Sequence, residues 1–187
     1  MSVDLNFDVG QVQRISNALK AASSKLDLVM VRAQNHTGAK ARTAMIRALV
    51  PQTGMKRKTM AKALKAKKAF NGSNFEIKAK GGDVRLVFFK PRETRKGVSA
   101  APWNKRSVYP GTFMKGGLFP KRVALKTNGA VLERAGKARL PLAAAPRSGL
   151  YIPTEMVTGN SEAVFYATVQ REMPGRIAHE LYRVLGS

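Results

Sequence analysis

The chain has 187 residues, of which 44% are apolar, 34 are Lys or Arg and 11 are Asp or Glu, so its net charge is +23. It contains no cysteine, which excludes disulfides and thiolate metal sites. The apolar fraction suffices for one domain with its own core, so wholesale disorder is excluded as well. The basic excess predicts an anionic partner, or acidic neighbours in an assembly.

The positive charge is concentrated in the middle of the chain. Residues 28–147 contain 28 basic and four acidic side chains, and no acidic residue occurs between Asp27 and Glu76. The two ends are close to neutral. The longest apolar runs are far shorter than the roughly 18 residues of a membrane span, so we expect a soluble protein of a cytoplasm-like compartment.

Apolar residues at spacings of three and four predict a helix in the N-terminal part of the chain. One helix over about 9–49, roughly 60 Å long, fits the pattern better than two helices broken at Asn35–Gly38. Pro51 is expected to end this helix. The apolar stripe consists of Val12, Ile15, Leu19, Ala22, Leu26, Val29 and Ala33, and continues at Ala41, Ala44, Met45 and Leu49.

The next segment, "MKRKTMAKALKAKKAF" (55–70), has seven basic and no acidic residues. We expect a helix here, with Thr53 as its N-cap and a narrow apolar arc of Met60, Ala61 and Leu64. An arc this narrow, without aromatic residues, does not fit a helix that lies on a membrane. Three interpretations remain: contact with nucleic-acid phosphates, contact with an acidic protein surface, and a solvated face without a ligand.

Alternating apolar residues in "FEIKAKGGDVRLVFF" predict a β-hairpin of strands 75–79 and 84–88, joined at Gly81–Gly82. Its buried face would consist of Phe75, Ile77, Leu86 and Phe88.

Further strands are expected at 107–114, 121–126 and 129–134, after a long basic loop at 90–111. The "TNGA" sequence at 127–130 is expected to be the turn of a second hairpin.

Apolar spacing predicts a C-terminal helix over 160–185, split into two pieces by Pro174 and Gly175. The order of elements predicts a single α+β domain, with a long N-terminal helix and a C-terminal helix packed on a mainly antiparallel sheet. Its parts would be an N-terminal helical part (9–68), a sheet part (73–142) and the C-terminal helical part.

No catalytic pattern stands out in the sequence. Glu76 and Lys78 have the spacing of a carboxylate and lysine in metal-dependent nucleases, but a metal would need more carboxylates than nearby Asp83 supplies. His179 and Glu180 begin a zincin motif that lacks its second histidine. We expect no catalytic, cofactor or metal site and no small-molecule substrate. Motifs that read bases are also missing, so any phosphate binding would be nonspecific.

Three stretches together resemble the phage minor tail protein Z family. They are "LVPQTGMKRKTM" (49–60), "YPGTFM" with "GAVLERAGKARLPL" (within 109–142), and "GLYIPTEMV" with "REMPGRIAHELYRVL" (within 149–185). The similarity covers most of the chain from about residue 9 onward, and the order and spacing of the stretches carry it. Trp103, in "SAAPWNKRSV", departs from the family pattern.

The resemblance implies a structural virion protein at the head-proximal end of a phage tail, which completes the tail for head–tail joining and DNA passage. It implies a ring of the chain with itself, a hexamer by analogy, and tail terminator or head–tail connector proteins as partners, with virion DNA in the lumen. Such a protein would lie in the tail or neck of the virion, and in the host cytoplasm during assembly. The alternative is a nonspecific nucleic-acid-binding protein that uses the basic centre. In either case we expect contact with DNA or a partner at Lys56, Arg57, Lys58, Lys62, Lys65, Lys67, Lys68, Arg92, Arg95 and Lys96.

Overall fold

The long N-terminal helix is continuous. The computed structural model describes residues 9–70 and 73–185, and α1 (Val9–Thr53) is one helix of 45 residues, about 67 Å long. The one-helix prediction is therefore confirmed. The side chains of residues 9–24 lie outside the described part of the structure, and the first four positions of the predicted apolar stripe lie there with them.

Gly38 marks a close contact in α1. A Cβ added at Gly38 would lie 2.2 Å from the Cδ1 atom of Phe75. The aromatic ring therefore packs directly on the helix backbone at this position, which explains a glycine inside the helix despite its cost of about 1 kcal/mol.

The prediction that Pro51 ends α1 is wrong. The helix includes Pro51 and ends at Thr53, whose hydroxyl donates to the carbonyl of Leu49 at 2.7 Å. The N–H of Gly54, which has a φ of +79°, donates to the carbonyl of Val50 at 3.0 Å, the usual closing bond before a left-handed glycine. Thr53 therefore stabilises the end of α1, and the prediction that it caps the next helix is wrong.

The basic segment is part helix and part strand. α2 (Arg57–Ala63) leads directly into β1 (Leu64–Lys67), which pairs with the antiparallel strand β2 (Glu76–Ala79). The prediction of one helix over 55–70 is therefore wrong beyond residue 63. The apolar arc ends at Leu64, so a longer helix would bury nothing further, whereas the strand gains backbone hydrogen bonds from β2.

An arginine on α1 holds the junction between α2 and β1. The Nη2 atom of Arg42 donates to the carbonyls of Ala61 and Leu64 at 2.8 and 2.6 Å. These acceptors are carbonyls that the end of a helix leaves without partners. Met60 and Leu64 are fully buried beside them, so the predicted apolar arc does dock on the core.

The predicted hairpin at Gly81–Gly82 does not form. β2 pairs with β1, and the residues after the glycines lead into the 3-10 turn η1 (Leu86–Phe88). Val84 instead bonds to a distant segment: its N–H donates to the Leu150 carbonyl at 3.0 Å, and its carbonyl accepts from the Ser148 N–H at 3.1 Å.

The shape of η1 also corrects the predicted buried face. Phe88 is 41% exposed, whereas Leu86 and Phe89 are buried. Because a 3-10 turn repeats every three residues, residues 86 and 89 point to the same side. A strand would have put 86 and 88 there.

The predicted loop at 90–111 contains a three-stranded antiparallel sheet, so that prediction is wrong. Its strands are β3 (Arg92–Thr94), β4 (Gly97–Ala100) and β5 (Ser107–Pro110), with β4 in the centre. All four residues of β4 are buried, which explains why a sequence rich in turn residues forms ordered strands here.

The connection between β4 and β5 is fixed to the helical part. It contains the 3-10 turn η2 (Pro102–Asn104), in which the Trp103 Nε1 atom donates to Glu155 Oε1 at 2.8 Å. The Nδ2 atom of Asn104 donates to the Pro51 carbonyl at 2.5 Å. Trp103, where the sequence departs from the family pattern, therefore joins this connection to the helices.

The other strands are very short. β6 (Thr112–Phe113), β9 (Leu132–Arg134) and β10 (Leu142–Ala144) form a second three-stranded sheet, and β7 (Lys115–Gly116) pairs with β8 (Val123–Ala124). All but β10 lie within or next to the strand positions predicted from the sequence, and no strand was predicted at 142–144.

A turn does occur at 127–130, where the Ala130 N–H donates to the Thr127 carbonyl at 3.0 Å. The predicted second hairpin around it is wrong, however, because β8 pairs with β7 while β9 pairs with β6 and β10.

The C-terminal helix is also continuous. After the short α3 (Ile152–Met156), α4 (Gly159–Leu185) runs through Pro174, so the predicted split into two pieces is wrong. Pro174 is exposed, and the neighbouring turn is held to α1 by a Lys40–Glu172 ion pair of 2.6 Å. This contact with α1 helps to offset the one helical hydrogen bond that the proline removes.

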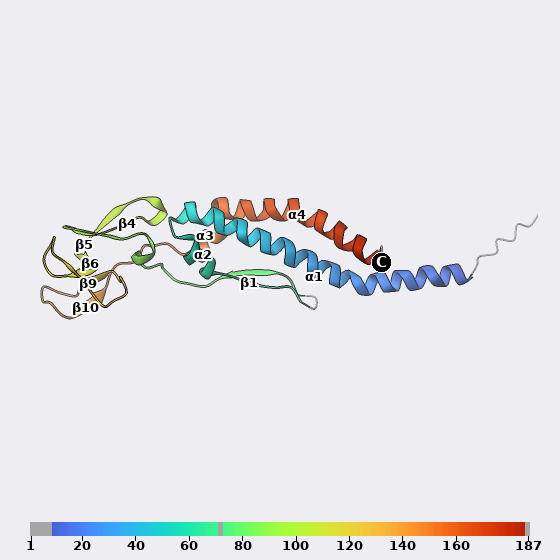
Figure 1. The fold of residues 1–187 in the computed structure, drawn as a ribbon, viewed down its shortest axis with the longest axis horizontal. Coiled ribbons are helices and arrows are strands. Elements are labelled where there is room, and N and C mark those ends of the chain that lie inside the picture. The colour runs from blue at the N-terminus through green and yellow to red at the C-terminus, as the bar shows by residue number, and fades with distance from the viewer. Residues whose placement is uncertain (1–8, 71–72, 186–187) are drawn as a thin grey trace, which may run out of the picture.

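The fold is α+β, as predicted, with two long helices and antiparallel strands. α4 lies along the second half of α1, while β4, β5, β6, β9 and β10 gather at the other end of an elongated molecule (Figure 1). The strands form four small sheets, and the helices pack mainly on each other. In the described part of the chain, no helix is long and apolar enough to cross a membrane. The core lies where α1 meets α2, β1 and the segments around η1 and α3, and it contains Met45, Ile46, Leu49, Met55, Met60, Leu64, Val84, Leu86, Phe89, Ala100, Leu150 and Ile152.

Candidate anion-binding surface

The basic residues predicted as contacts all lie on the surface. Each of the ten is exposed, and among the described residues none of them forms a salt bridge. The structure separates them into two groups. Seven lie on and around α2 and β1, and three lie on or beside the turn between β3 and β4.

The first group, on α2 and β1, is a basic ridge over the core. Met60 and Leu64 are buried beneath it, and Lys62 between them is exposed. In the β1–β2 register Lys65 faces Lys78, a pair of like charges directly opposite each other, which is an unfavourable arrangement in a sheet. The same register places Lys67 opposite Glu76, which offsets part of this charge, while the other cations of the ridge are exposed.

Glu76 and Lys78 form a salt bridge with each other, at 2.5 Å. The hydrogen bond and charge of Lys78 lower the pKa of Glu76, with a smaller contribution from Lys67. Asp83 is engaged elsewhere: its Oδ1 atom accepts from the Gly149 N–H at 2.7 Å. In the part of the chain that the structure describes, no group of three or more His, Cys, Asp or Glu side chains could hold a metal.

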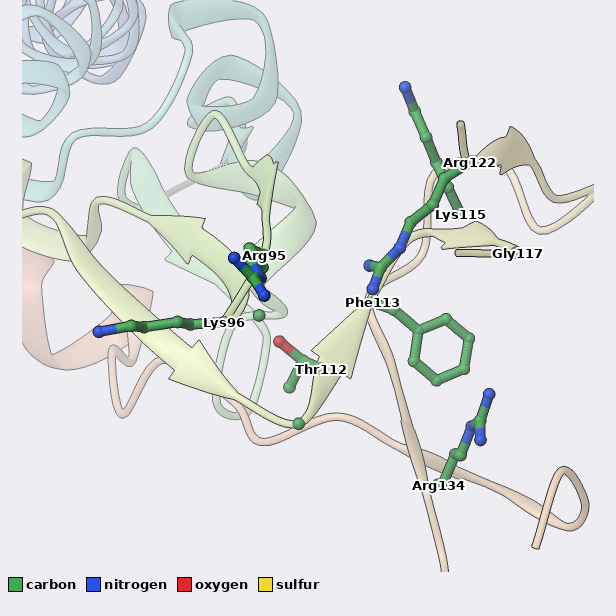
Figure 2. A pocket seen from close by; sticks show the side chains of 11 residues that line it. Arg95, Lys96, Thr112, Phe113, Lys115, Gly117, Arg122 and Arg134 are labelled. Carbon is green, nitrogen blue, oxygen red and sulfur yellow. The ribbon is translucent and has the colours of Figure 1, made fainter. Parts of the chain in front are cut away.

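The second group lies beside a pocket of about 220 Å³ at the sheet end. Arg95 and Lys96 line this pocket, whereas Arg92 does not. Arginines 122 and 134 line it as well (Figure 2). The pocket also includes Lys115, Thr112, Phe113 and four glycines: Gly97, Gly111, Gly116 and Gly117.

One carboxylate organises the wall of this pocket. Glu93 forms an ion pair with Arg122, and its Oε2 atom accepts from the Met114 N–H at 3.0 Å. Both side chains of the pair are largely buried, with 20% of Arg122 and 10% of Glu93 exposed. Glu93 thus fixes the position of Arg122 and neutralises it.

Aromatic rings position the guanidinium groups further. The Cζ atom of Arg134 lies 5.9 Å from the centre of the Phe113 ring, and that of Arg122 lies 6.0 Å from the centre of the Phe119 ring. Such cation–π contacts orient an arginine without neutralising its charge. Arg134 therefore remains available to an anion.

Sequence reasoning found Arg95 and Lys96 but missed Lys115, Arg122 and Arg134. The five cations of the pocket are spread over the 40 positions 95–134 and belong to three of the small sheets or their connections. The only signal in the sequence was the general basic excess of residues 28–147, which does not say which cations converge.

Comparisons with protein-family models, with curated proteins and with solved structures found no match to this chain. Its function is therefore inferred from its residues and their arrangement.

Proposed function

We propose that this chain is a noncatalytic structural protein of a long-tailed phage virion. In this proposal it is a subunit of a ring at the head-proximal end of the tail, and it completes the tail for head–tail joining and DNA passage. One observation carries the proposal: the sheet end leaves large apolar side chains uncovered. Leu118 is 87% exposed, Val123 71% and Leu140 66%.

Uncovered apolar side chains of this size are typical of surfaces that another protein covers. They lie on or near β7, β8 and β10, and these strands are too short to bury them. A head-to-tail contact between copies generates a ring when its rotation closes. Ring formation would therefore supply the cover that the single chain lacks.

The stretches that resemble the minor tail protein Z family support the same proposal. "YPGTFM" forms β5 and β6, and "GAVLERAGKARLPL" contains β9 and leads into β10. The resemblance in the middle of the chain therefore falls on the sheet end, where the uncovered apolar side chains lie. In the proposed ring, the basic ridge and the pocket would face virion DNA in the lumen or an acidic tail terminator or connector protein.

The alternative function is nonspecific nucleic-acid binding by a monomer or dimer. Ten exposed cations, which form no salt bridge with any residue that the structure describes, favour it, because such a surface binds phosphates without reading sequence. The two functions differ in whether the chain assembles.

Self-assembly of the purified chain tests the proposal. We expect rings by mass photometry and negative-stain microscopy, alone or with a tail partner. The variant L118S/V123S/L140S should remain monomeric, while the control Y182S, which changes a side chain 79% exposed on α4, should still assemble. A wild-type chain that stays monomeric with every tail partner yet saturates DNA would replace the proposal with the alternative.

A further inference from the structure

The pocket beside the β3–β4 turn concentrates positive charge that the fold does not neutralise. Five cationic side chains line it, and they come from segments far apart in the sequence. Glu93 neutralises Arg122. Glu133 lies near the rim, 3.8 Å from where a Cβ of Gly111 would be, but it does not line the pocket. Among the described residues, the lining therefore retains a surplus of cations.

Folding that brings like charges together is unfavourable unless something offsets the repulsion. Arg95 and Arg134 are exposed and have no salt bridge in the part of the chain that the structure describes. A bound anion would provide the missing charge. We propose that this pocket binds a phosphate group, and that the phosphate belongs to the backbone of a nucleic acid.

The chemistry of the lining fits a phosphate. Planar guanidinium groups donate pairs of parallel hydrogen bonds to phosphate oxygens, and Arg95, Arg122 and Arg134 all lie around the pocket (Figure 2). The Thr112 hydroxyl is already used, since it donates to the Tyr109 carbonyl at 2.7 Å and accepts from the Val98 N–H at 3.0 Å. Arg95 and Arg134, together with Lys115, are therefore the groups that would hold the ligand, since Glu93 already neutralises Arg122.

Two glycines of the pocket lining cannot readily be replaced by residues with side chains. A side chain at Gly97 would meet the Tyr109 carbonyl oxygen at 2.1 Å, and Gly117 has a φ of +93°. Gly97 allows β5 to approach β4 closely, and Gly117 has a backbone conformation that other residues rarely adopt, so both glycines maintain the shape of the pocket lining.

A nucleic acid fits better than an acidic protein because the cations continue beyond the pocket. Lys96 extends away from it (Figure 2), and the basic ridge of α2 and β1 lies further along the same elongated molecule (Figure 1). A polymer with one negative charge for every 1.7 Å or so of its axis can meet both groups. This inference rests on the part of the proposed function in which the basic centre contacts DNA.

The test compares two double variants of equal charge. R95Q/R134Q removes two exposed guanidiniums from the pocket, and R47Q/K80Q removes two exposed cations on α1 and after β2. Binding of a labelled DNA duplex is followed by fluorescence anisotropy over a range of salt concentrations. We expect the affinity of the pocket variant for DNA to decrease at least about tenfold. The slope of log binding constant against log salt concentration should become shallower by up to about 1.8. The DNA affinity of the control should change little. The unfolding midpoint of the pocket variant should not fall below that of wild type, because the substitution removes two like charges from the lining.

Binding measurements with other anions on the same variants identify the ligand. Equal loss in the two variants would overturn the proposal, because only the overall field would then matter. Pocket-dependent binding of polyglutamate as strong as that of DNA would show an acidic protein ligand, and pocket-dependent binding of inorganic phosphate alone would show a free-anion site. Either result would overturn the assignment to a nucleic acid. Ring formation by R95Q/R134Q, measured in parallel, keeps a failure here distinct from a failure of the proposed assembly.

Discussion

The helical end and the sheet end of this molecule are built differently. On α4, two fully buried polar side chains have partners: the Ser161 hydroxyl donates to the Glu155 carbonyl at 2.6 Å, and Glu180 lies among three arginines. At the sheet end, residues 107–146 contain one buried residue, Thr112. The same chain thus combines a part with its own core and, beyond the buried strand β4, an outer part that has almost no buried residue.

The two ends therefore differ in what stabilises them. Burial stabilises a domain roughly in proportion to the apolar area removed from water, and short strands without a covered face are only marginally stable alone. The helical end therefore depends on its own side chains, whereas the sheet end depends on what covers it.

The largest effect should come from the core beside η1. Phe89→Ala should reduce the free energy of unfolding by about 3–5 kcal/mol, since it empties a fully buried site. The matched control is Phe88→Ala, next to it but 41% exposed, which should cost about 1 kcal/mol or less. Urea denaturation of the purified chain measures both, and a larger loss at Phe88 than at Phe89 would support the strand predicted from the sequence instead of the 3-10 turn.

The buried carboxylate between the helices should come next. Glu180 lies 3.6 Å from Arg32, 2.5 Å from Arg176 and 3.4 Å from Arg183. Glu180→Ala should cost about 3 kcal/mol, at the lower end for a broken buried pair because water reaches the arginines. The control Glu172→Ala, which breaks a more exposed pair, should cost about 1 kcal/mol or less. A loss at position 180 as small as at 172 would contradict the role of this cluster.

Charge on the basic ridge should matter little for folding and more for binding. In K62E/K65E/K67E the unfolding free energy should stay within about 1 kcal/mol of wild type, because all three side chains are exposed. The slope of log DNA-binding constant against log salt concentration should become shallower by about 0.9 for each phosphate that the ridge no longer binds. Under the proposed function, the yield of infectious particles should decrease. Normal infectivity with unchanged DNA binding would make the ridge a solvated face.

The smallest effect concerns pH. Burial, then Arg176 and Lys40, lowers the pKa of His36 from its usual 6.5. The unfolded chain therefore takes up the proton first as the pH falls, so stability should decrease below about pH 6.5. His36→Gln should flatten this dependence in denaturation curves recorded from pH 7.5 to 5.5. A wild-type curve that is already flat would contradict the shift.

Long periodic patterns were predictable from the sequence, but strand partners were not. The stripe of α1 identified one helix, in which Val29 and Ala33 are buried as expected, whereas Leu26 on the same stripe is 47% exposed. The alternation around Ile77 identified a strand but not its partner, because residues 64–67 offer a match only once Leu64 is anchored in the core. Prolines 51 and 174 misled the boundaries, since each costs one hydrogen bond that other contacts offset.

The candidate site could be predicted only in part, for a similar reason. Arg95 and Lys96 stand out as a basic turn in the sequence. Arg122 and Arg134 join them only through the pairing of β6 with β9 and of β7 with β8. Nothing local in the sequence indicates that convergence.

Hydrogen exchange tests most directly the claim that the sheet end depends on assembly. In a monomer, amides of 107–146 should be much less protected than those of 29–49 on α1, because the strands have no covered face. In assembled particles the same amides should gain protection, while 29–49 should stay as they were. Equal protection of both regions in a proven monomer, or no gain at 107–146 on assembly, would contradict the account.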